Sequence, residues 1–395
     1  MLRSVPALPR VSHNGRVSRF RFPVLALALS ASAALVTPVA NATRGLRRSI
    51  GATPDPFDSP QYRDGAFWNR LPSAVVEGSA QGSMAIDFAK KGDIGRPTGP
   101  VPLVTPDLPA EASDFAATWL GHATVLLEVS GHWVLTDPVW SDRVSPSATV
   151  GPKRHHPVPM TLGEVPELSA VVISHDHYDH LDTATIDWLS ENQSMPFVVP
   201  LGIGAHLRSW GVSADRIVEL DWGQSHTVSR AGIADLVVSC TEARHFSGRG
   251  ITRNKTLWSS WVIAAGPAEK PCRVFFGGDS GYTPAFVDLG AQYGPFDLTV
   301  LPVGAYDARW SDIHMNPAEA VQTHRDVGGS LLLPIHWATF DLAFHSWSAP
   351  VEWLIEEAAA QDVRVALPRP GERFGADDVP DRTWWREVSR ESRAS

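Results

Sequence analysis

The sequence predicts an α+β protein in which two β-sheets pack face to face with helices on their outer sides. Three observations lead to this prediction: strand-like runs follow one another, helix-like segments are inserted singly between them, and no segment is repeated. The chain has 395 residues, of which 43% are hydrophobic and 19% charged, so it is long enough to bury a large core. One large domain or two modest ones are therefore expected.

Residues 1–42 have the pattern of a bacterial-type export signal. They contain five arginines and no acid, an apolar stretch from Phe22 to Ala40, and the small-residue triplet Ala40-Asn41-Ala42. The apolar stretch is barely long enough to span a bilayer, so an N-terminal anchor that is not cleaved is the alternative. We therefore expect an exported protein, periplasmic or secreted, which is membrane-anchored if this segment stays attached.

Charge and cysteine content exclude two classes of protein. The formal net charge is −9, and without residues 1–42 there remain 29 basic and 43 acidic side chains. Such an acidic chain has no basic face for a phosphate backbone, so no nucleic-acid partner is expected. Two cysteines, Cys240 and Cys272, fit an exported protein that does not depend on a disulfide framework. Two free buried thiols are the expected state, and their pairing stays open.

Residues 43–112 predict an irregular N-terminal arm. They are rich in Pro, Gly and polar residues, which interrupt regular structure, and one short helix is expected near Gly82 to Lys90. We interpret the arm as a decoration that lies over the main body, residues 113–395, and not as a second catalytic domain.

The main body begins with hairpin strands of one sheet, separated by Gly-His turns. These strands are expected at 116–120, 124–129 and 133–137. Five prolines between 137 and 159 then indicate a loop, because each removes a hydrogen-bond donor and fixes the backbone. A buried strand at 168–173 and an amphipathic helix at 181–189 follow.

The second half of the chain is rich in strands. Strands are expected at 197–200, 217–220, 224–228, 236–240, 258–264, 273–276, 297–301 and 330–334. Helices are expected at 204–210 and 317–326. Asn316 caps the second of these helices, Pro317 occupies its first position, and Glu319 completes a capping box.

A dense group of metal-ligand residues follows the buried strand 168–173. The order is His-x-His-x-Asp-His, formed by His175, His177, Asp179 and His180. Imidazole nitrogen and carboxylate oxygen are ligands that zinc, iron and manganese prefer. Alternate side chains of a tight loop, here His175, His177 and Asp179, lie on one side of it. His180 is out of this alternation and can face a second ion. A His-rich polar surface loop is the competing interpretation.

Three more polar residues stand where predicted strands end. They are His245, Asp279 and His336, and each follows an apolar strand and precedes a turn. A single histidine in such a place is most often an ordinary core or loop residue. Together with the loop 175–180, however, these residues supply seven nitrogen or oxygen ligands. That number suits two adjacent divalent ions with one bridging water.

This ordered set resembles the metallo-β-lactamase superfamily, whose fold is an αββα sandwich with the metals at one edge of the two sheets. Further segments resemble the branch of the N-acyl-phosphatidylethanolamine-hydrolysing phospholipases D. They lie at 119–124, 136–138, 143–154, 245–250, 278–282 and 334–340. The resemblance runs from about Asp114 to Phe374 and leaves the export segment outside.

The resemblance implies a di-zinc site, with iron or manganese as alternatives. The first ion would be held by His175, His177 and His245. The second would be held by Asp179, His180 and His336, and Asp279 would bridge both. Asp179 and Asp279 would thus be catalytic as well as metal-binding.

Three other residues receive roles. His314 lies where this branch has a histidine near the substrate, so it is a catalytic candidate that steadies an oxygen in the transition state. Asp137 is expected either to orient a ligand, by accepting from an imidazole N–H or a loop amide, or simply to cap a turn. His122 is expected to be mainly structural, with support of the metal site as the alternative.

The function implied is a phospholipase D-type phosphodiesterase acting on N-acyl-phosphatidylethanolamine-like lipids. A lactonase or other ester hydrolase is the alternative, so the partner is a lipid or small-molecule ester or diester. From another class, a di-iron binding or redox protein remains open. A lipid substrate suggests peripheral membrane contact through an exposed apolar patch, for which Trp310, Trp337 and Phe340 are candidates. The oligomeric state is left open.

Overall fold

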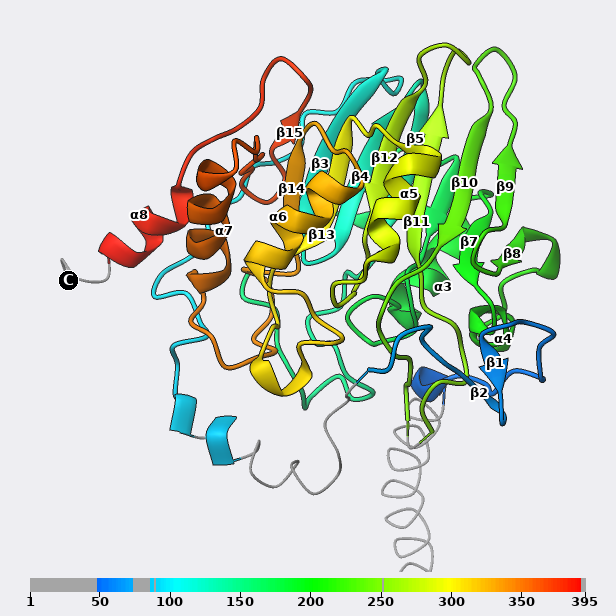
Figure 1. Cartoon of the computed structure of the whole chain (residues 1–395), viewed down its shortest axis with the longest axis horizontal. Helices are drawn as coiled ribbons and strands as arrows, with labels where there is room; N and C mark the ends of the chain where they lie inside the picture. Colours follow the sequence, from blue (N-terminus) through cyan, green and yellow to red (C-terminus); the bar gives the residue numbers. More distant parts are fainter. Residues whose placement is uncertain (1–47, 74–85, 89, 251, 392–395) are drawn as a thin grey trace, which may run out of the picture. The chain divides into compact units, whose positions relative to one another are not determined.

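Two β-sheets lie at the centre of the unit formed by residues 48–395 in the computed structural model (Figure 1). The structure describes residues 48–73, 86–88, 90–250 and 252–391. The predicted export segment 1–42 lies outside these residues, so its export role and the protein's location stay predictions.

The first sheet has seven strands. In chain order they are β3 (Phe115–Gly121), β4 (Thr124–Val129), β5 (His132–Thr136), β6 (Ala170–Val172), β7 (Phe197–Pro200), β8 (Ile217–Leu220) and β15 (Arg373–Phe374). Their order in the sheet is β15-β3-β4-β5-β6-β7-β8. Pairing is antiparallel from β15 to β5 and parallel from β5 to β8.

The second sheet has six strands. They are β9 (Ser225–Val228), β10 (Leu236–Thr241), β11 (Ser260–Ala265), β12 (Cys272–Phe276), β13 (Leu298–Pro302) and β14 (Leu332–Ile335), in the order β14-β13-β12-β11-β10-β9. Because β11 is antiparallel to both its neighbours while β12, β13 and β14 are parallel, four strands run in one direction. The carboxyl ends of β10, β12, β13 and β14 therefore meet at one edge of this sheet.

Helices cover the sheets on their outer sides. Those of regular length are α3 (Thr183–Asn192), α4 (Ile203–Ser209), α5 (Ala285–Tyr293), α6 (Pro317–Asp326), α7 (Ala349–Ala360) and α8 (Trp384–Glu391). The helix α6 packs on β13 of the second sheet, and α4 packs on β7 and β8 of the first. In Figure 1, α5 and α6 lie in front of the second sheet. The predicted αββα sandwich is confirmed.

The first sheet is buried on both faces, and the side-chain alternation of β4 shows why. Val125 and Leu127 point into the cluster between the two sheets, where they join Trp261 and Ile263 of β11. Leu126, one residue out of phase, joins the cluster under the outer helices. Successive side chains of a strand point to opposite faces, so a strand with apolar side chains on both faces requires cover on both sides.

Most predicted elements are confirmed to within a few residues. The capping box of α6 is present, with Glu319 N donating to Asn316 Oδ1 and Asn316 N donating to Glu319 Oε2. The helices α5, α7 and α8 were not predicted. Of the helix expected at 82–90, the described residues 86–88 and 90 are helical, and the remainder lies outside the described part of the chain.

The abundant tryptophans serve packing. Trp337 stacks on Trp119 and on Trp384, with ring centroids 5.6 and 5.4 Å apart. The prediction of an exposed apolar patch from Trp310, Trp337 and Phe340 is wrong, because these side chains are only 9%, 3% and 8% exposed. Each is packed against other apolar or aromatic groups of the main body. Within the described residues, no helix is long and apolar enough to cross a membrane.

Both cysteines are free, as expected, but of the two only Cys240 is buried as predicted. Cys240 is fully buried and Cys272 is half-buried. Burial raises the pKa of both thiols, so they stay protonated at neutral pH.

Candidate metal centre

The predicted ligands come together where strands of both sheets end. His245, Asp279 and His336 follow β10, β12 and β14, whose carboxyl ends share one edge of the second sheet. The loop 175–180 follows β6 of the first sheet, and Ser259 N before β11 donates to Ser174 O over 3.0 Å. This bond ties the loop to the second sheet. The position of the site is therefore set by strand direction and by sheet packing.

Three imidazole nitrogens form a first group. His177 Nδ1 lies 2.8 Å from His175 Nε2 and 3.3 Å from His245 Nε2. The opposite ring nitrogens are engaged elsewhere: His245 Nδ1 donates to Ile313 O over 2.8 Å, and His175 Nδ1 contacts Ser174 Oγ at 2.9 Å. Because the proton of the His245 ring is on Nδ1, the lone pair of Nε2 is free and faces the other two imidazoles. A histidine that binds a metal ion has this tautomer.

A second group combines two imidazoles and a carboxylate. Asp179 Oδ2 lies 3.5 Å from His180 Nε2 and 3.4 Å from His336 Nε2. All three side chains are buried or nearly so. The loop 175–180 therefore contributes to both groups, as predicted, with His175 and His177 in the first and Asp179 and His180 in the second.

Asp279 joins the two groups through one oxygen. Its Oδ2 lies 3.2 Å from His180 Nε2 and 3.1 Å from His336 Nε2. The same oxygen lies 3.9 Å from both His175 Nε2 and His245 Nε2. It stands between the groups, where a ligand shared by two ions would stand.

The electrostatics of the cluster favour a cation. Burial would lower the pKa of His180, but Asp279, Asp179 and Asp137 raise it well above its ordinary value. Burial would raise the pKa of Asp279, but the imidazoles of His180, His336 and His314 hold it well below its ordinary value. Three buried carboxylates thus produce a strongly negative potential at the nitrogens that face them.

Orphaned polar atoms support the same conclusion. His180 Nε2, His336 Nε2 and Asp279 Oδ1 are buried and find no hydrogen-bond partner among the described residues. Buried polar atoms are rarely left without a partner unless an ion or water completes them. Histidine and aspartate are suitable ligands for zinc, so these residues fit two divalent ions. The structure brings all seven predicted ligands together, and their individual assignments stay predictions.

Asp137 fixes the orientation of a predicted ligand. Its carboxylate accepts from His180 Nδ1 over 2.6 Å and from the Ser174 amide over 2.7 Å. The prediction that it accepts from an imidazole N–H or a loop amide is confirmed, since it does both. The proton held on His180 Nδ1 leaves Nε2 free to bind an ion.

Replacing Asp137 by Asn is expected to weaken binding of the second ion about 10–100-fold. The amide can keep the bond from Ser174 N, but its NH2 group would face His180 Nδ1 and favour the tautomer that carries the proton on Nε2. Zinc affinity measured by chelator competition checks this. Asp297→Asn, at an exposed carboxylate that accepts from Arg273 N, is the matched control. Equal affinities in both variants would show that Asp137 does not set the tautomer.

His122 touches the site more directly than predicted. Its Nε2 lies 2.9 Å from Asp179 Oδ2, and its ring centroid lies 4.0 Å from that of His336. Burial lowers the pKa of His122 to about 3, so the neutral ring donates from Nε2 to the Asp179 carboxylate. His122 therefore supports a predicted ligand, which was the alternative to a purely structural role.

A further support of the loop 175–180 was given no role from the sequence, although part of it lies in the segment 245–250 that resembles the phospholipase D branch. Asp176 points away from the ligand groups: its Oδ1 accepts from Gly248 N over 2.7 Å, and its Oδ2 lies 3.3 Å from His206 Nε2. The buried Arg249 guanidinium donates to Asp176 O and Leu181 O over 2.8 and 2.6 Å. His206 was given no role from the sequence, yet it helps to hold the loop.

His314 stands at the site. Its Nδ1 lies 3.9 Å from Asp279 Oδ2 and finds no hydrogen-bond partner among the described residues. The side chain is 14% exposed, more than those of His175 and His245. It is therefore within reach of a molecule that enters the site, as its predicted role requires.

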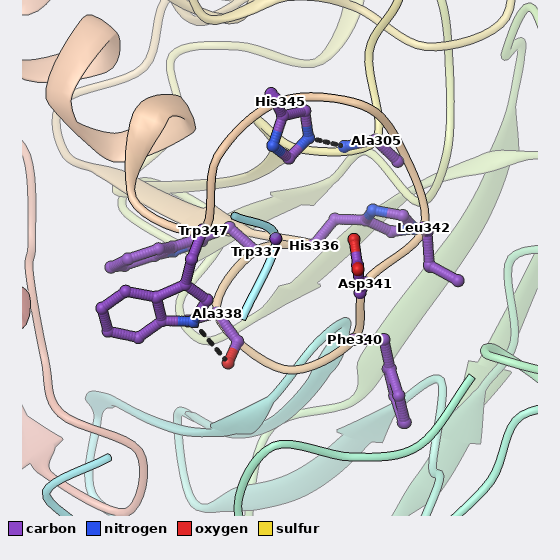
Figure 2. A pocket seen from close by; sticks show the side chains of 10 residues that line it. Ala305, His336, Trp337, Ala338, Phe340, Asp341, Leu342, His345 and Trp347 are labelled. Carbon is purple, nitrogen blue, oxygen red and sulfur yellow. Dashed lines mark hydrogen bonds between the residues drawn. The ribbon is translucent and has the colours of Figure 1, made fainter. Parts of the chain in front are cut away.

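A small cavity beside His336 shows how that residue is held (Figure 2). Trp347 Nε1 donates to Ala338 O over 3.3 Å, and Ala305 N donates to His345 Nε2 over 2.9 Å. On the same loop, the Asp341 carboxylate pairs with the Lys91 ammonium of the arm. His336 itself has a positive φ of 64°, and its N–H donates to His122 O over 3.1 Å.

Comparison with known proteins places the chain in a family. Residues 132–337 match the family described as Beta-lactamase superfamily domain. An uncharacterised protein of Mycobacterium tuberculosis is 49% identical over 369 residues, which cover 90% of this chain and 97% of the relative. The N-acyl-phosphatidylethanolamine-hydrolyzing phospholipase D 1 of Caenorhabditis elegans is 39% identical over 253 residues, covering 62% of this chain and 70% of the relative.

The fold also has solved counterparts. The isothiocyanate hydrolase from Delia radicum gut bacteria has a TM-score of 0.50 and 17% identity, covering 66% of this chain and 98% of that protein. At this identity the likeness concerns the fold alone. The family match and the sequence relatives, together with the cluster of histidines and aspartates, confirm a metal-dependent hydrolase. The chain belongs to the metallo-β-lactamase superfamily, in the branch of the N-acyl-phosphatidylethanolamine-hydrolysing phospholipases D.

Proposed function

We propose that the protein is a phosphodiesterase that hydrolyses N-acyl-phosphatidylethanolamine-like lipids with two divalent ions, zinc being the expected metal. The observation that carries this proposal is the 39% identity over 253 residues to the Caenorhabditis elegans enzyme of that name. The convergence of seven residues with nitrogen and oxygen ligands, Asp279 among them, supports it, because such a cluster suits hydrolysis at neutral pH.

Divalent ions in a centre of this kind supply a water of lowered pKa and stabilise charge on phosphoryl oxygens. In the reaction, oxygen from water forms a bond to phosphorus while the bond from phosphorus to the N-acylethanolamine oxygen breaks. The leaving oxygen takes a proton, and phosphatidate is the second product. Among the chain's own residues, the charge of His180 and the His122 Nε2 donor hold the pKa of Asp179 well below its ordinary value, so this carboxylate stays an anion.

His314 is placed to donate to the phosphoryl oxygen on which charge develops. Its Nδ1 is buried beside Asp279 and has no described partner that competes for it. A positioned donor of this kind typically contributes about 100- to 1000-fold to kcat.

We expect His314→Ala to lower kcat about 100- to 1000-fold while zinc content stays at the wild-type value, because His314 is not among the seven predicted metal ligands. Steady-state kinetics with a synthetic N-acyl-phosphatidylethanolamine, alongside metal analysis, check this. His226→Ala, a half-buried histidine on the edge strand β9, is the control. Unchanged turnover and affinity in His314→Ala would remove this residue from the mechanism.

A turnover panel tests the proposed function itself. The purified chain is assayed on an N-acyl-phosphatidylethanolamine, a lactone and a β-lactam, each with and without chelator, and its metal content is determined. Diester turnover that chelator abolishes, with two zinc ions per chain, supports the proposal. Lactone turnover without diester turnover would favour the ester hydrolase, and two iron ions without any hydrolysis would favour a di-iron protein.

A further inference from the structure

We propose that Asn69, in the N-terminal arm, is a positioning residue for the metal ligand His245. The arm segment 69–73 lies against the chain just after β10: it holds the backbone of His245 and contacts the side chains of Glu242 and Arg244. We call this segment the strap. The sequence predicts the arm as a decoration, whereas these contacts make the strap part of the metal centre. The inference rests on the proposed metal centre, because it assigns the strap an effect on the first ion.

The Asn69 amide holds the His245 backbone on both sides. Asn69 Nδ2 donates to His245 O over 2.8 Å, and His245 N donates to Asn69 Oδ1 over 3.2 Å. The same Oδ1 accepts from Trp258 Nε1 over 2.8 Å, and Nδ2 also donates to Ser73 Oγ over 3.0 Å. Each atom of the amide group therefore has its partners. Its orientation is fixed from outside the His245 loop.

Neighbouring residues fasten the strap at two more points. The Arg70 guanidinium lies 3.0 Å from the Glu242 carboxylate, whose side chain is only 7% exposed. Arg244 Nε donates to Ser73 Oγ over 3.2 Å, and its Nη2 donates to Pro72 O. The ion pair and the Arg244 bonds extend the contact beyond Asn69 itself. The strap is thus held along its length and can transmit a restraint to His245.

His245 is in turn restrained at three positions. Asn69 holds its backbone N–H and C=O, and Ile313 O accepts from its Nδ1. What remains free is Nε2, which faces His177 Nδ1 at 3.3 Å. Zinc tolerates only about 0.2 Å of variation in its bond to an imidazole nitrogen. A shift of the His245 backbone would therefore lower the affinity for the first ion. The second group contains no residue that the described strap contacts, so the affinity for the second ion should not change.

The test is Asn69→Asp. Aspartate keeps the acceptor for His245 N and Trp258 Nε1, but it places a carboxylate oxygen opposite His245 O, where the amide donated. We expect the affinity for the first zinc ion to fall about 10–100-fold, as for other groups that hold a ligand in place. The affinity for the second ion is expected to stay unchanged. Zinc titrations of the full chain in competition with a chromogenic chelator measure both binding steps. His177→Ala removes a predicted ligand of the first ion, so the step that remains in this variant belongs to the second ion.

Asn192→Asp is the matched control. Asn192 also donates its Nδ2 to a backbone carbonyl, Trp188 O over 2.8 Å, but it is exposed at the end of α3. It should bind both ions as the wild type does. Asn69→Ser, which removes the amide without adding charge, is measured in parallel and replaces Asn69→Asp if the latter does not fold. Thermal unfolding of the chelator-treated proteins reports any general loss of stability.

The outcomes separate the inference from the proposed function. Selective loss of the first ion in the Asn69 variants supports the inference. Wild-type affinity for both ions in Asn69→Asp and Asn69→Ser overturns it. So does parallel loss of both ions together with a large fall in the unfolding temperature, because that pattern indicates a structural role. If the wild type itself binds no divalent ion, the proposed metal centre fails before the strap is tested.

Discussion

Asp279→Asn is expected to lower the affinity for each of the two zinc ions by more than about 100-fold. This effect is larger than is usual for residues that only orient a ligand. Asp279 Oδ2 is a carboxylate oxygen that lies within 4 Å of imidazoles from both predicted groups. Two dications held close together repel each other strongly in a buried site, and the carboxylate charge between them offsets that repulsion. An amide has the same shape but no charge, so it leaves the repulsion uncompensated.

Metal analysis after dialysis at a fixed free-zinc concentration checks this result, and turnover should be lost in parallel. Asp297→Asn makes the same chemical change at an exposed carboxylate and is expected to bind two ions. Because Asp279 also lies 3.2 and 3.1 Å from the His180 and His336 imidazoles, the metal-free variant should unfold at a lower temperature than the metal-free wild type, so metal content and not stability is the deciding measurement. A variant that keeps one ion at full affinity would show that Asp279 serves a single ion.

The ligands could be predicted because each stands at a strand end that the sequence reveals. Apolar runs precede His175, His245, Asp279 and His336, and polar side chains after such runs are few. Their convergence is a property of the sheets: β10, β12 and β14 run in one direction, and β6 of the other sheet ends against the same edge. The family resemblance supplied the division into two groups, which the distances match.

Apart from Asp137 and His122, the groups that hold the ligands could not be predicted. Asn69 lies 176 positions from His245, and its bonds to that residue go to backbone atoms, which carry no residue identity. Arg249 likewise donates to a backbone carbonyl, that of Asp176. His206 contacts the Asp176 side chain, which points away from the ligand groups. Hydrogen bonds between distant segments leave no spacing that can be recognised along the chain.

The error over the aromatic residues has a related cause. Trp310, Trp337 and Phe340 follow or flank loops, which made them candidates for exposure. Trp310 in fact packs with Ile313 and Ala343, and Trp337 stacks on Trp119 and Trp384. Which side of a loop a ring packs against depends on segments far along the chain. Local sequence therefore predicts strand ends well and loop packing poorly.

The loop 175–180 should separate the two ions by mutation. His177→Ala is expected to remove mainly the first ion, because His177 Nδ1 lies near His175 Nε2 and His245 Nε2 and belongs to no other ligand group in the described structure. Asp179→Ala is expected to remove mainly the second ion, because Asp179 Oδ2 lies near His180 and His336. In each variant the affected ion should bind more than about 100-fold more weakly, since a direct ligand is lost.

Zinc content and stepwise affinity of the two variants provide the measurement, with His226→Ala and Asp297→Ala as controls that should keep two ions. Turnover should fall in both variants, because the reaction as proposed needs both ions. Only metal analysis can therefore distinguish them. If His177→Ala and Asp179→Ala lost both ions equally, the two groups would form one cooperative site, and Asp279 would couple the ions rather than merely lie between them. Selective loss would instead mean that each half of the six-residue loop binds its own ion, with strand ends from the second sheet completing each site independently.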